Sequence, residues 1–287
     1  MSIYTTALIL GLAYSSLALG IYISMRIFNI PDITTDGSFT LGGAVTATLT
    51  IAGVSPVLSL PVAFLSGAIA GIATGWIHTR LRVNALLAGI LVSSALYSIN
   101  LIIMGRSNLP LINLPSIFSI FHLPISESLN QIFILILFTS VLLFLLHHLL
   151  RSDFGLAMRA TGNNENMIRS LGVNTDRMKI TGLALANGLV ALSGYLITAV
   201  EGYADINMGI GVIMLGLGSV MIGEMTGRIK ASGSTGLKLI SVIGGSIVFR
   251  MILGLALAAG IDPVYLKILV ALFVLAVVAV PQINYKR

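Results

Sequence analysis

The stretch Ile30-Pro-Asp-Ile-Thr-Thr-Asp-Gly-Ser-Phe-Thr-Leu-Gly-Gly43 separates the first two long apolar runs of the chain. It contains Asp32 and Asp36, two of only ten acidic residues in the sequence. Pro31 and the threonine pair after it indicate that the stretch is largely not helical. It is therefore either a polar turn between two helices or a break in a helix at membrane depth.

The overall composition excludes a water-soluble fold. Of the 287 residues, 56% are hydrophobic and 9% are charged, and the mean hydropathy is +1.02. Soluble domains carry about 25% charged residues, so this chain lacks the charge needed to cover a water-exposed surface. The absence of cysteine excludes disulfides, thiolate metal sites and a cysteine nucleophile. No basic residue precedes Arg26, so we expect the first apolar run to be retained as a span.

The apolar runs predict an all-α, polytopic transmembrane helical bundle with a single domain over residues 1–287. A spanning helix needs about 20 mostly apolar residues, and the sequence offers about nine such segments, of which the second and seventh are short and glycine-rich. The expected spans are 3–25, 38–54, 57–78, 85–103, 131–149, 180–200, 208–223, 236–259 and 264–281. Gly67, Gly71 and Gly75 share one helix face, which predicts close packing against another helix.

The basic residues predict the orientation of the bundle. With a cytoplasmic C-terminus, thirteen basic residues lie in the inner segments: Arg26, Arg80, Arg82, Arg151, Arg159, Arg169, Arg177, Lys179, Arg228, Lys230, Lys238, Lys286 and Arg287. Only Arg106 and Lys267 fall outside, and Arg250 lies within a span. The positive-inside rule therefore places the N-terminus outside and the C-terminus in the cytoplasm. The net charge of +6 is explained by topology, and we expect no nucleic-acid partner.

The largest inner loop, residues 150–179, has the capping signals of short helices. Asn163 or Asn164 can cap a helix that runs to about Leu171, with Glu165 near its positive end. Gly172 fits a left-handed stop, and Asn174 or Thr175 can cap the next span. Helix connections in bundles usually take 2–8 residues, so a capped loop of this length is expected to dock onto a partner.

This loop resembles a known family. Gly155-Leu-Ala-Met-Arg-Ala160-Thr-Gly162-Asn-Asn164-Glu, followed by Ser170-Leu-Gly172-Val-Asn174, is similar to the coupling loop of ATP-binding-cassette importer permeases of the branched-chain amino acid and ribose type. The sequence looks closest to small permeases assigned to tryptophan or other amino acid uptake. The resemblance implies that the loop contacts an ATPase through eight residues: Ala160, Gly162, Asn163, Asn164, Glu165, Leu171, Gly172 and Asn174.

The same resemblance implies the partners and the location. We expect a separate ATPase subunit, because the chain has no phosphate-binding loop and is not an enzyme on its own. Further expected partners are an extracytoplasmic substrate-binding protein, a second permease copy in a homodimer, and membrane lipid. The expected location is the bacterial inner membrane, and the transported solute is an amino acid or a related compound. The sequence indicates no cofactor and no metal site.

Residues 34–38 are similar to a Gly-Ile-Asp-Leu-Ser-type segment of the sugar permeases and to an Asn-Phe-Ala-His-Gly-type segment of the amino acid permeases of this family. The expected translocation-pathway residues are Asp32, Thr34, Thr35, Asp36, Ser38 and Arg250. Three interpretations of the aspartate pair remain open: a catalytic dyad, a cytoplasmic turn in which Asp36 caps the next helix, and a re-entrant segment beside the pathway. The dyad lacks a histidine or a metal-ligand partner nearby.

Arg250 is expected near the middle of the eighth span. A guanidinium at membrane depth costs at least ~2.5 kcal/mol, so it should face a partner or a cavity. One interpretation pairs it with Asp32, Asp36 or Glu224; the other has it line the pathway and attract a substrate carboxylate. Asn84, Asn100 and Asn187 are expected to hydrogen-bond between helices. The outer segment 104–130, with Glu201 and Asp205, is the expected contact for the binding protein.

A secondary transporter is the alternative function. Such proteins carry paired broken helices near the membrane midplane, and the glycine-rich segments 37–43 and 208–218 match that pattern. An intramembrane enzyme would need a catalytic constellation, which the sequence does not offer.

Overall fold

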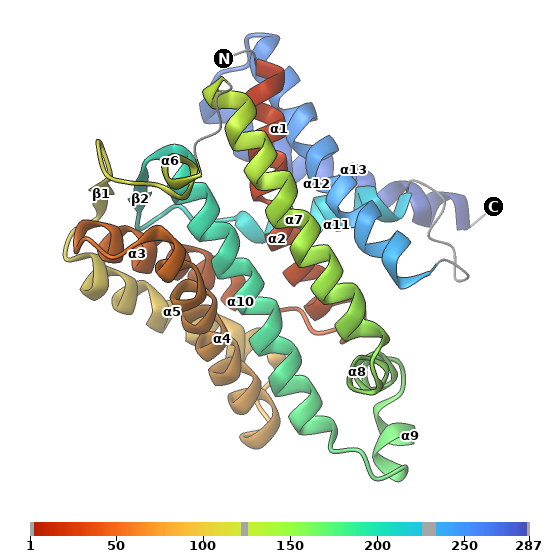
Figure 1. The fold of residues 1–287 in the computed structure, drawn as a ribbon. Coiled ribbons are helices and arrows are strands. Elements are labelled where there is room, and N and C mark those ends of the chain that lie inside the picture. Colours follow the sequence, from red (N-terminus) through yellow and green to blue (C-terminus); the bar gives the residue numbers. More distant parts are fainter. Residues whose placement is uncertain (1–2, 122–125, 226–233, 286–287) are drawn as a thin grey trace.

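The computed structural model describes residues 3–121, 126–225 and 234–285, and these form a helical bundle with one small sheet (Figure 1). The first apolar run is one bent span built from α1, α2 and the π-helical turn η1. In chain order the elements are α1 Ile3–Ala13, α2 Ser15–Ile21, η1 Tyr22–Ile27, α3 Thr34–Ile51, α4 Pro56–Arg80, α5 Ala85–Met104, β1 Asn108–Pro110, α6 Ile117–Ile120, α7 Glu127–Arg151, α8 Asp153–Asn163, α9 Glu165–Ser170, α10 Thr175–Glu201, β2 Tyr203–Asp205, α11 Val212–Met225, α12 Thr235–Ala258, η2 Pro263–Tyr265 and α13 Leu266–Tyr285.

Helix α10 is the centre of the bundle, because α2, α3 and α4 all pack against it (Figure 1). The glycine face of α4 lies directly on the α10 backbone. A side chain at Gly67 would collide with the carbonyl oxygen of Asn187, and one at Gly71 would collide with that of Leu183. The close packing expected from the glycine spacing is therefore confirmed, and it holds α4 antiparallel to α10.

A second group of helices packs on the other side of the first span. Helices α1 and α12 touch along Gly11, whose missing side chain leaves room for Ile247. The Ser246 hydroxyl donates a hydrogen bond of 2.7 Å to the Gly11 carbonyl oxygen. Helices α11 and α13 pack beside α12, and α7 packs on α1.

Within the described residues, six helices are long and apolar enough to cross a membrane: Ile3–Ile27, Pro56–Arg80, Ala85–Met104, Glu127–Arg151, Thr175–Glu201 and Thr235–Ala258. Helices α11 and α13 are shorter apolar helices, and α3 is not among the six. The structure therefore supports an all-helical membrane bundle, and the count of nine spans remains a prediction.

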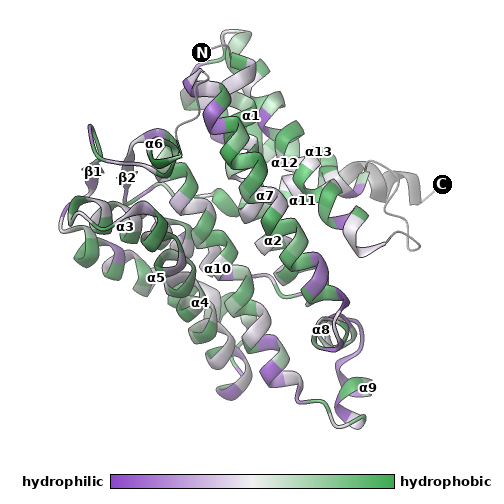
Figure 2. Cartoon of the chain, in the orientation of Figure 1, coloured by the Kyte–Doolittle hydropathy of each residue, from purple (hydrophilic) through white to green (hydrophobic). Residues whose placement is uncertain are grey.

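Polar and apolar residues are separated along the bundle (Figure 2). Large apolar side chains are exposed along α4, α5 and α7, where the fold alone leaves them uncovered. Hydrophilic residues gather at the end of the bundle that carries α8 and α9, called the α8–α9 end below. This distribution matches helices whose sides face lipid and whose ends face water.

The opposite end of the bundle is closed by the small sheet, and it is called the β-sheet end below. Strands β1 and β2 pair antiparallel, with Leu109 opposite Ala204 and Asn108 opposite Asp205. Leu109 and Ala204 are buried against the ends of α3 and α5. The sheet thus joins the two segments that were expected to meet a binding protein, 104–130 and the segment after Glu201; residues 122–125 of the first lie outside the described part.

Candidate functional site

The break between the first span and α3 lies inside the bundle, beside the middle of α10. Residues 28–33 are not helical, and α3 begins at Thr34, so the expectation that most of 30–43 is non-helical is wrong. The reason is that Pro31 precedes the helix, and the Asp32 carboxylate accepts the Thr34 N–H at 2.9 Å at its start. The threonines then face inward, and Thr34 hydrogen-bonds Thr74 of α4 at 2.7 Å.

Asp32 is anchored to the middle of α10. The Asn187 side chain donates a hydrogen bond of 2.6 Å to the Asp32 carboxylate and accepts one of 2.7 Å from the Ser38 hydroxyl. Asn187 lies about 18 Å from the first residue of α10, at ~1.5 Å per residue. All three side chains are buried. The expected role of Asn187 as a hydrogen-bond link between helices is confirmed.

Asp36 caps a helix, but a different one from the helix expected. Its carboxylate accepts the N–H groups of Gly211 and Ile213, both at 3.0 Å, at the start of α11. The expectation that Asp36 caps its own helix is wrong, because Asp36 already lies in the first turn of α3. An anion at the first turn of α11 is favourable, since the helix dipole is positive there.

The other end of α11 is held by Arg26, which lies near the end of the first span. Arg26 forms an ion pair with Glu224, in the last turn of α11. Ile213 and Glu224 are separated by about 17 Å along the helix, at ~1.5 Å per residue. Residues 26–36 therefore run from the α8–α9 end, where Arg26 lies, back into the bundle. They reach Asp36, which lies near the level of Asn187 in the middle of α10. This supports the re-entrant interpretation of the segment.

A small cavity of about 60 Å³ opens beside Asp36. It lies between α3, α5 and the segment before α11, and its walls are Asp36, Gly37, Thr40, Ser93, Tyr97, Asn100, Ile206, Gly209 and Ile210. Tyr97 and Ile210 at its rim are exposed, whereas Asn100 is buried. Ser93 and Tyr97 were missed as candidate site residues. The helical spacing of Ser93, Tyr97 and Asn100 in an otherwise apolar helix is the signal that would have found them.

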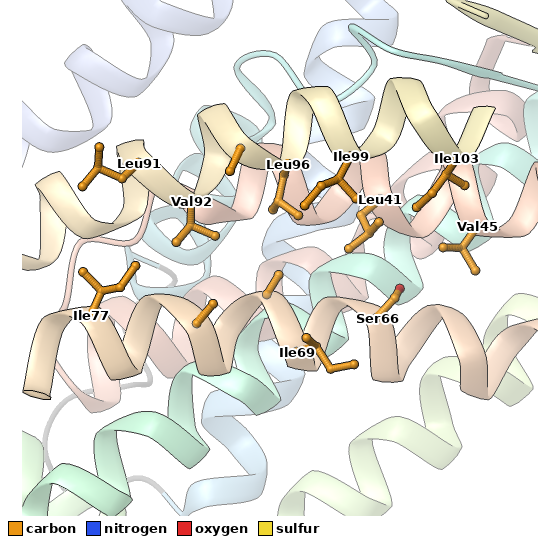
Figure 3. A pocket seen from close by; sticks show the side chains of 13 residues that line it. Leu41, Val45, Ser66, Ile69, Ile77, Leu91, Val92, Leu96, Ile99 and Ile103 are labelled. Atoms are coloured by element: carbon orange, nitrogen blue, oxygen red, sulfur yellow. The ribbon is translucent and has the colours of Figure 1, made fainter. Parts of the chain in front are cut away.

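The neighbouring face of α5 is apolar. Together with α3 and α4 it forms a groove of about 520 Å³ in which Ser66 is the only polar side chain (Figure 3). Leu91, Val92, Leu96, Ile99 and Ile103 of α5 line it. Helix α5 therefore separates an apolar groove, suited to lipid tails, from the polar cavity beside Asp36.

Among the described residues Arg250 forms no ion pair with Asp32, Asp36 or Glu224, so these three proposed pairings are wrong. Its guanidinium carbon lies 3.8 Å from the centre of the Tyr14 ring, and Tyr14 in turn stacks on Phe39 of α3 at 5.7 Å. Glu224 pairs with Arg26 instead. An aromatic face attracts a cation electrostatically, so the ring takes the place that a carboxylate was expected to fill.

The loop between α7 and α10 is built by the expected caps. Asn164 ends α8 and caps α9 through the Met167 N–H at 3.0 Å. Gly172 has a left-handed φ of 87°, and Asn174 caps α10 through the Arg177 N–H at 3.0 Å. Asn163 is the last residue of α8, so Asn164 is the cap.

Glu165 ties this loop together. Its carboxylate pairs with Lys179 at 2.6 Å and with Arg169 at 2.9 Å, and it accepts the Thr175 hydroxyl at 3.1 Å. Partial burial raises the pKa of Glu165, but the hydrogen bonds from Lys179 and Thr175 and the two positive charges outweigh it and hold the pKa below its ordinary value. Helix α9 is thereby fixed to the start of α10.

Helix α8 contacts the residues that precede the break. A side chain at Gly162 would collide with the carbonyl oxygen of Ile27. The Asn29 side chain donates a hydrogen bond of 3.1 Å to the Gly162 carbonyl oxygen, and Asn29 has a left-handed φ of 54°. The loop at the α8–α9 end is thus in direct contact with the segment that leads to Asp32 and Asp36.

The described residues contain no group of three His, Asp or Glu side chains placed to hold a metal ion. Four of the ten acidic residues of the sequence instead serve as caps or ion-pair partners in the site described above: Asp32, Asp36, Glu165 and Glu224.

Residues 3–279 match the family model described as "Branched-chain amino acid transport system / permease component". The chain is 37% identical to the tyrosine transport system permease protein of Clostridioides difficile (strain R20291), over 99% of this chain and 92% of that protein. It is also 37% identical to an uncharacterised protein of Rickettsia prowazekii (strain Madrid E), over 95% of each. The autoinducer 2 import system permease protein LsrC of Yersinia enterocolitica is 29% identical over 82% of this chain and 63% of that protein. No solved structure matches the chain.

Proposed function

Since the chain belongs to the family of branched-chain amino acid transport system permease components, we propose that it moves an amino acid along a pathway bordered by α3, α5 and α11. It is a transmembrane permease subunit of an ATP-binding-cassette importer, located in a bacterial inner membrane. Permease components of this family are not enzymes themselves, so ATP hydrolysis is assigned to a separate subunit.

The position of Asp36 is the observation that carries the proposed pathway. Asp36 lines a polar cavity close to the non-helical residues that separate the first span from α3. Non-helical backbone at such depth is tolerated only where protein or a water-filled cavity satisfies it. Asp32, Thr34, Thr35 and Ser38 are buried behind Asp36, and their proposed role is to hold the wall in place rather than to touch the solute.

The α8–α9 end is proposed to face the cytoplasm, with the N-terminus outside. Nine basic residues lie on the helices at this end or in the connections between them: Arg26, Arg80, Arg82, Arg151, Arg159, Arg169, Arg177, Lys179 and Lys238. The other four inner basic residues, Arg228, Lys230, Lys286 and Arg287, lie outside the described residues. Arg106 and Lys267 lie on elements at the opposite end. This asymmetry is the pattern of the positive-inside rule.

Helix α9 is the proposed contact for the ATPase. Its apolar residues Met167 and Leu171 are 58% and 67% exposed, although the loop that carries them is rigidly capped. Gly162, packed on Ile27, would pass a movement of the loop to residues 26–36 and from there to α3 and α11. The caps at Asn164, Gly172 and Asn174 keep the loop stiff enough to transmit it.

Two further partners are proposed from exposed surfaces. Helix α5 exposes Ser94, Tyr97 and Ser98, and hydroxyl groups that face lipid lose hydrogen bonds. A second copy of the chain, placed across this face, would enclose a polar pathway between the two copies. At the β-sheet end, the paired strands carry Asn108 and Asp205 on an exposed edge, where a substrate-binding protein would dock.

A secondary transporter remains the second candidate function, because the two glycine-rich segments do meet. Gly209 lies against the Asp36 carbonyl oxygen, and Asp36 caps α11, so the starts of α3 and α11 are in contact. The family match favours the ATP-driven importer, in which the same contact serves as a wall of the pathway.

The experiment that tests the importer assignment is co-purification of the ATPase subunit. Met167→Asp and Leu171→Asp together should abolish ATPase binding without affecting the fold of the permease. Leu81→Asp is the matched control, because Leu81 is equally apolar, 57% exposed and at the same end of the bundle. Normal co-purification with the α9 double variant would contradict the assignment of α9 as the contact.

A further inference from the structure

The small cavity beside Asp36 has an unusual balance of hydrogen-bonding groups. Asn100 is 1% exposed, and its amide nitrogen donates to the Gly37 carbonyl oxygen at 3.2 Å. This hydrogen bond fixes the orientation of the amide, because a carbonyl oxygen cannot pair with Oδ1. The Oδ1 atom of Asn100 is therefore left buried with no hydrogen-bond partner.

Apart from the Ser93 and Tyr97 hydroxyls, the donors described around the cavity are already used. The Gly209 N–H donates to Thr40 Oγ1 at 3.1 Å, and the Thr40 hydroxyl donates to the Asp36 carbonyl oxygen at 3.2 Å. The Gly211 and Ile213 N–H groups are taken by the Asp36 carboxylate. Besides these two hydroxyls, what remains among the described residues is acceptor capacity: Asn100 Oδ1 and the second lone pairs of the carboxylate oxygens.

The charge at the cavity is negative, and it favours the same kind of ligand as the free acceptors do. No Lys, Arg or His lines the cavity, and within the described residues Asp36 forms no ion pair. Its partners are the neutral backbone N–H groups of α11, which carry only the partial positive charge of a helix start. A ligand that donates several hydrogen bonds and carries a positive charge fits this site.

The size of the cavity limits the ligand group. Its volume of about 60 Å³ exceeds the ~30 Å³ that one water takes up and is far below the ~300 Å³ of a site for a whole small molecule. A primary ammonium group fits, and the rest of the solute would extend past the exposed rim residues Tyr97 and Ile210.

We propose that Asn100 Oδ1 and the Asp36 carboxylate bind the primary ammonium group of the amino acid during its passage. This inference rests on the proposed pathway and deepens it. It makes Asn100 a substrate-contacting residue in addition to its link to Gly37. Because the group recognised is common to all α-amino acids, the site favours the solute class and leaves side-chain selection to other contacts.

The test measures the thermal unfolding midpoint of the full permease–ATPase complex in lipid nanodiscs. Methylammonium chloride is the probe, and tetramethylammonium chloride and sodium chloride are added at the same ionic strength. Methylammonium should raise the midpoint in a saturable way, because a ligand of the native state stabilises it. Tetramethylammonium offers no N–H donors and should not. Protection by sodium instead of methylammonium would identify a metal-cation site and overturn the proposal.

Two variants separate binding from a structural role. Asn100→Leu removes the free acceptor and should abolish the methylammonium shift and lower amino acid uptake about tenfold or more, as expected for a lost hydrogen bond to a charged group. Asn100→Asp keeps an acceptor but loses the donor to Gly37, and it should retain the shift. Thr48→Val, which removes another α3–α5 hydrogen bond, to the Ile103 carbonyl oxygen and outside the cavity, is the matched control.

If both Asn100 variants lose the methylammonium shift, the residue only holds α5 to α3. If the wild type shows no shift, the cavity is a water site. Either result overturns the proposal. Normal co-purification of the ATPase with the Met167→Asp and Leu171→Asp double variant would instead contradict the contact proposed at α9. Because the two experiments have different readouts, the inference and the proposed function fail separately.

Discussion

Asp32 and Asn187 lie 155 residues apart in the sequence and are joined by a hydrogen bond of 2.6 Å in the middle of the bundle. Asn187 also accepts a hydrogen bond from Ser38, so one amide group holds both the break at Asp32 and the beginning of α3. The bond explains how a chain with few polar residues keeps a non-helical segment at membrane depth: nearly every polar group there has a fixed partner.

Asn187→Leu should destabilise the protein strongly. The substitution keeps the volume of the side chain but leaves the Asp32 carboxylate and the Ser38 hydroxyl buried with fewer partners, which costs about 3 kcal/mol. The free energy of unfolding, measured by denaturant titration in detergent, checks this. Asn84→Ala removes only the α5 cap, worth about 1 kcal/mol, and equal losses for the two variants would contradict the special role of Asn187.

Gly162→Ala should push α8 away from the first span. The added methyl group meets the Ile27 carbonyl oxygen, and overpacking of this kind costs about 1–3 kcal/mol. We expect weaker stimulation of transport by ATP, measured in proteoliposomes, with ATPase binding retained because α9 is unchanged. Gly244→Ala is the control, since nothing lies within 4 Å of a side chain at that position. Full ATP-driven transport by the Gly162 variant would argue against a relay through Ile27.

The local parts of this site were predictable from the sequence. A side-chain cap acts on N–H groups two or three residues away, so the roles of Asn164 and Asn174 follow from their neighbours in the chain. The stop at Gly172 is predictable for the same reason, because only the local backbone requires its left-handed φ. The glycine face of α4 was predictable from helical spacing.

The long-range parts were not predictable, for a physical reason. Asp36 was expected to cap the helix that follows it, but its partners are Gly211 and Ile213, which only the tertiary fold brings near. Arg250 was expected to pair with a carboxylate. Charge alone does not distinguish a carboxylate from an aromatic face, and the position of Tyr14 depends on how α12 packs on the first span.

The loop at the α8–α9 end should lose rigidity in acid. The pKa of Glu165 is lower in the folded protein than the ordinary value of about 4.3, despite partial burial, because of Lys179, Thr175 and Arg169. A lowered pKa gives stability that is complete above the unfolded value and is lost as the pH falls through the folded value. We therefore expect hydrogen-exchange protection of residues 165–174 to decrease below about pH 4.

Glu165→Gln separates this effect from general acid denaturation. The variant has no carboxylate to titrate, so protection in the loop should be lower at neutral pH and should change little between about pH 5 and 3 beyond the intrinsic exchange rate. Identical pH profiles for the variant and the wild type would show that Glu165 does not hold the loop.

Arg250→Ala should lower transport while the complex still assembles. The guanidinium stacks on Tyr14 and has a buried Nε with no hydrogen-bond partner, so part of its donor capacity is free. A free guanidinium within a span can attract an anionic group such as a substrate carboxylate. Uptake should fall about tenfold, as for one lost charged hydrogen bond, with normal ATPase co-purification. Tyr14→Leu removes the stacking, worth up to about 2 kcal/mol, but keeps the charge, so it should lower stability more than uptake. Wild-type uptake by the Arg250 variant would show that Arg250 serves only to pack α12 against the first span.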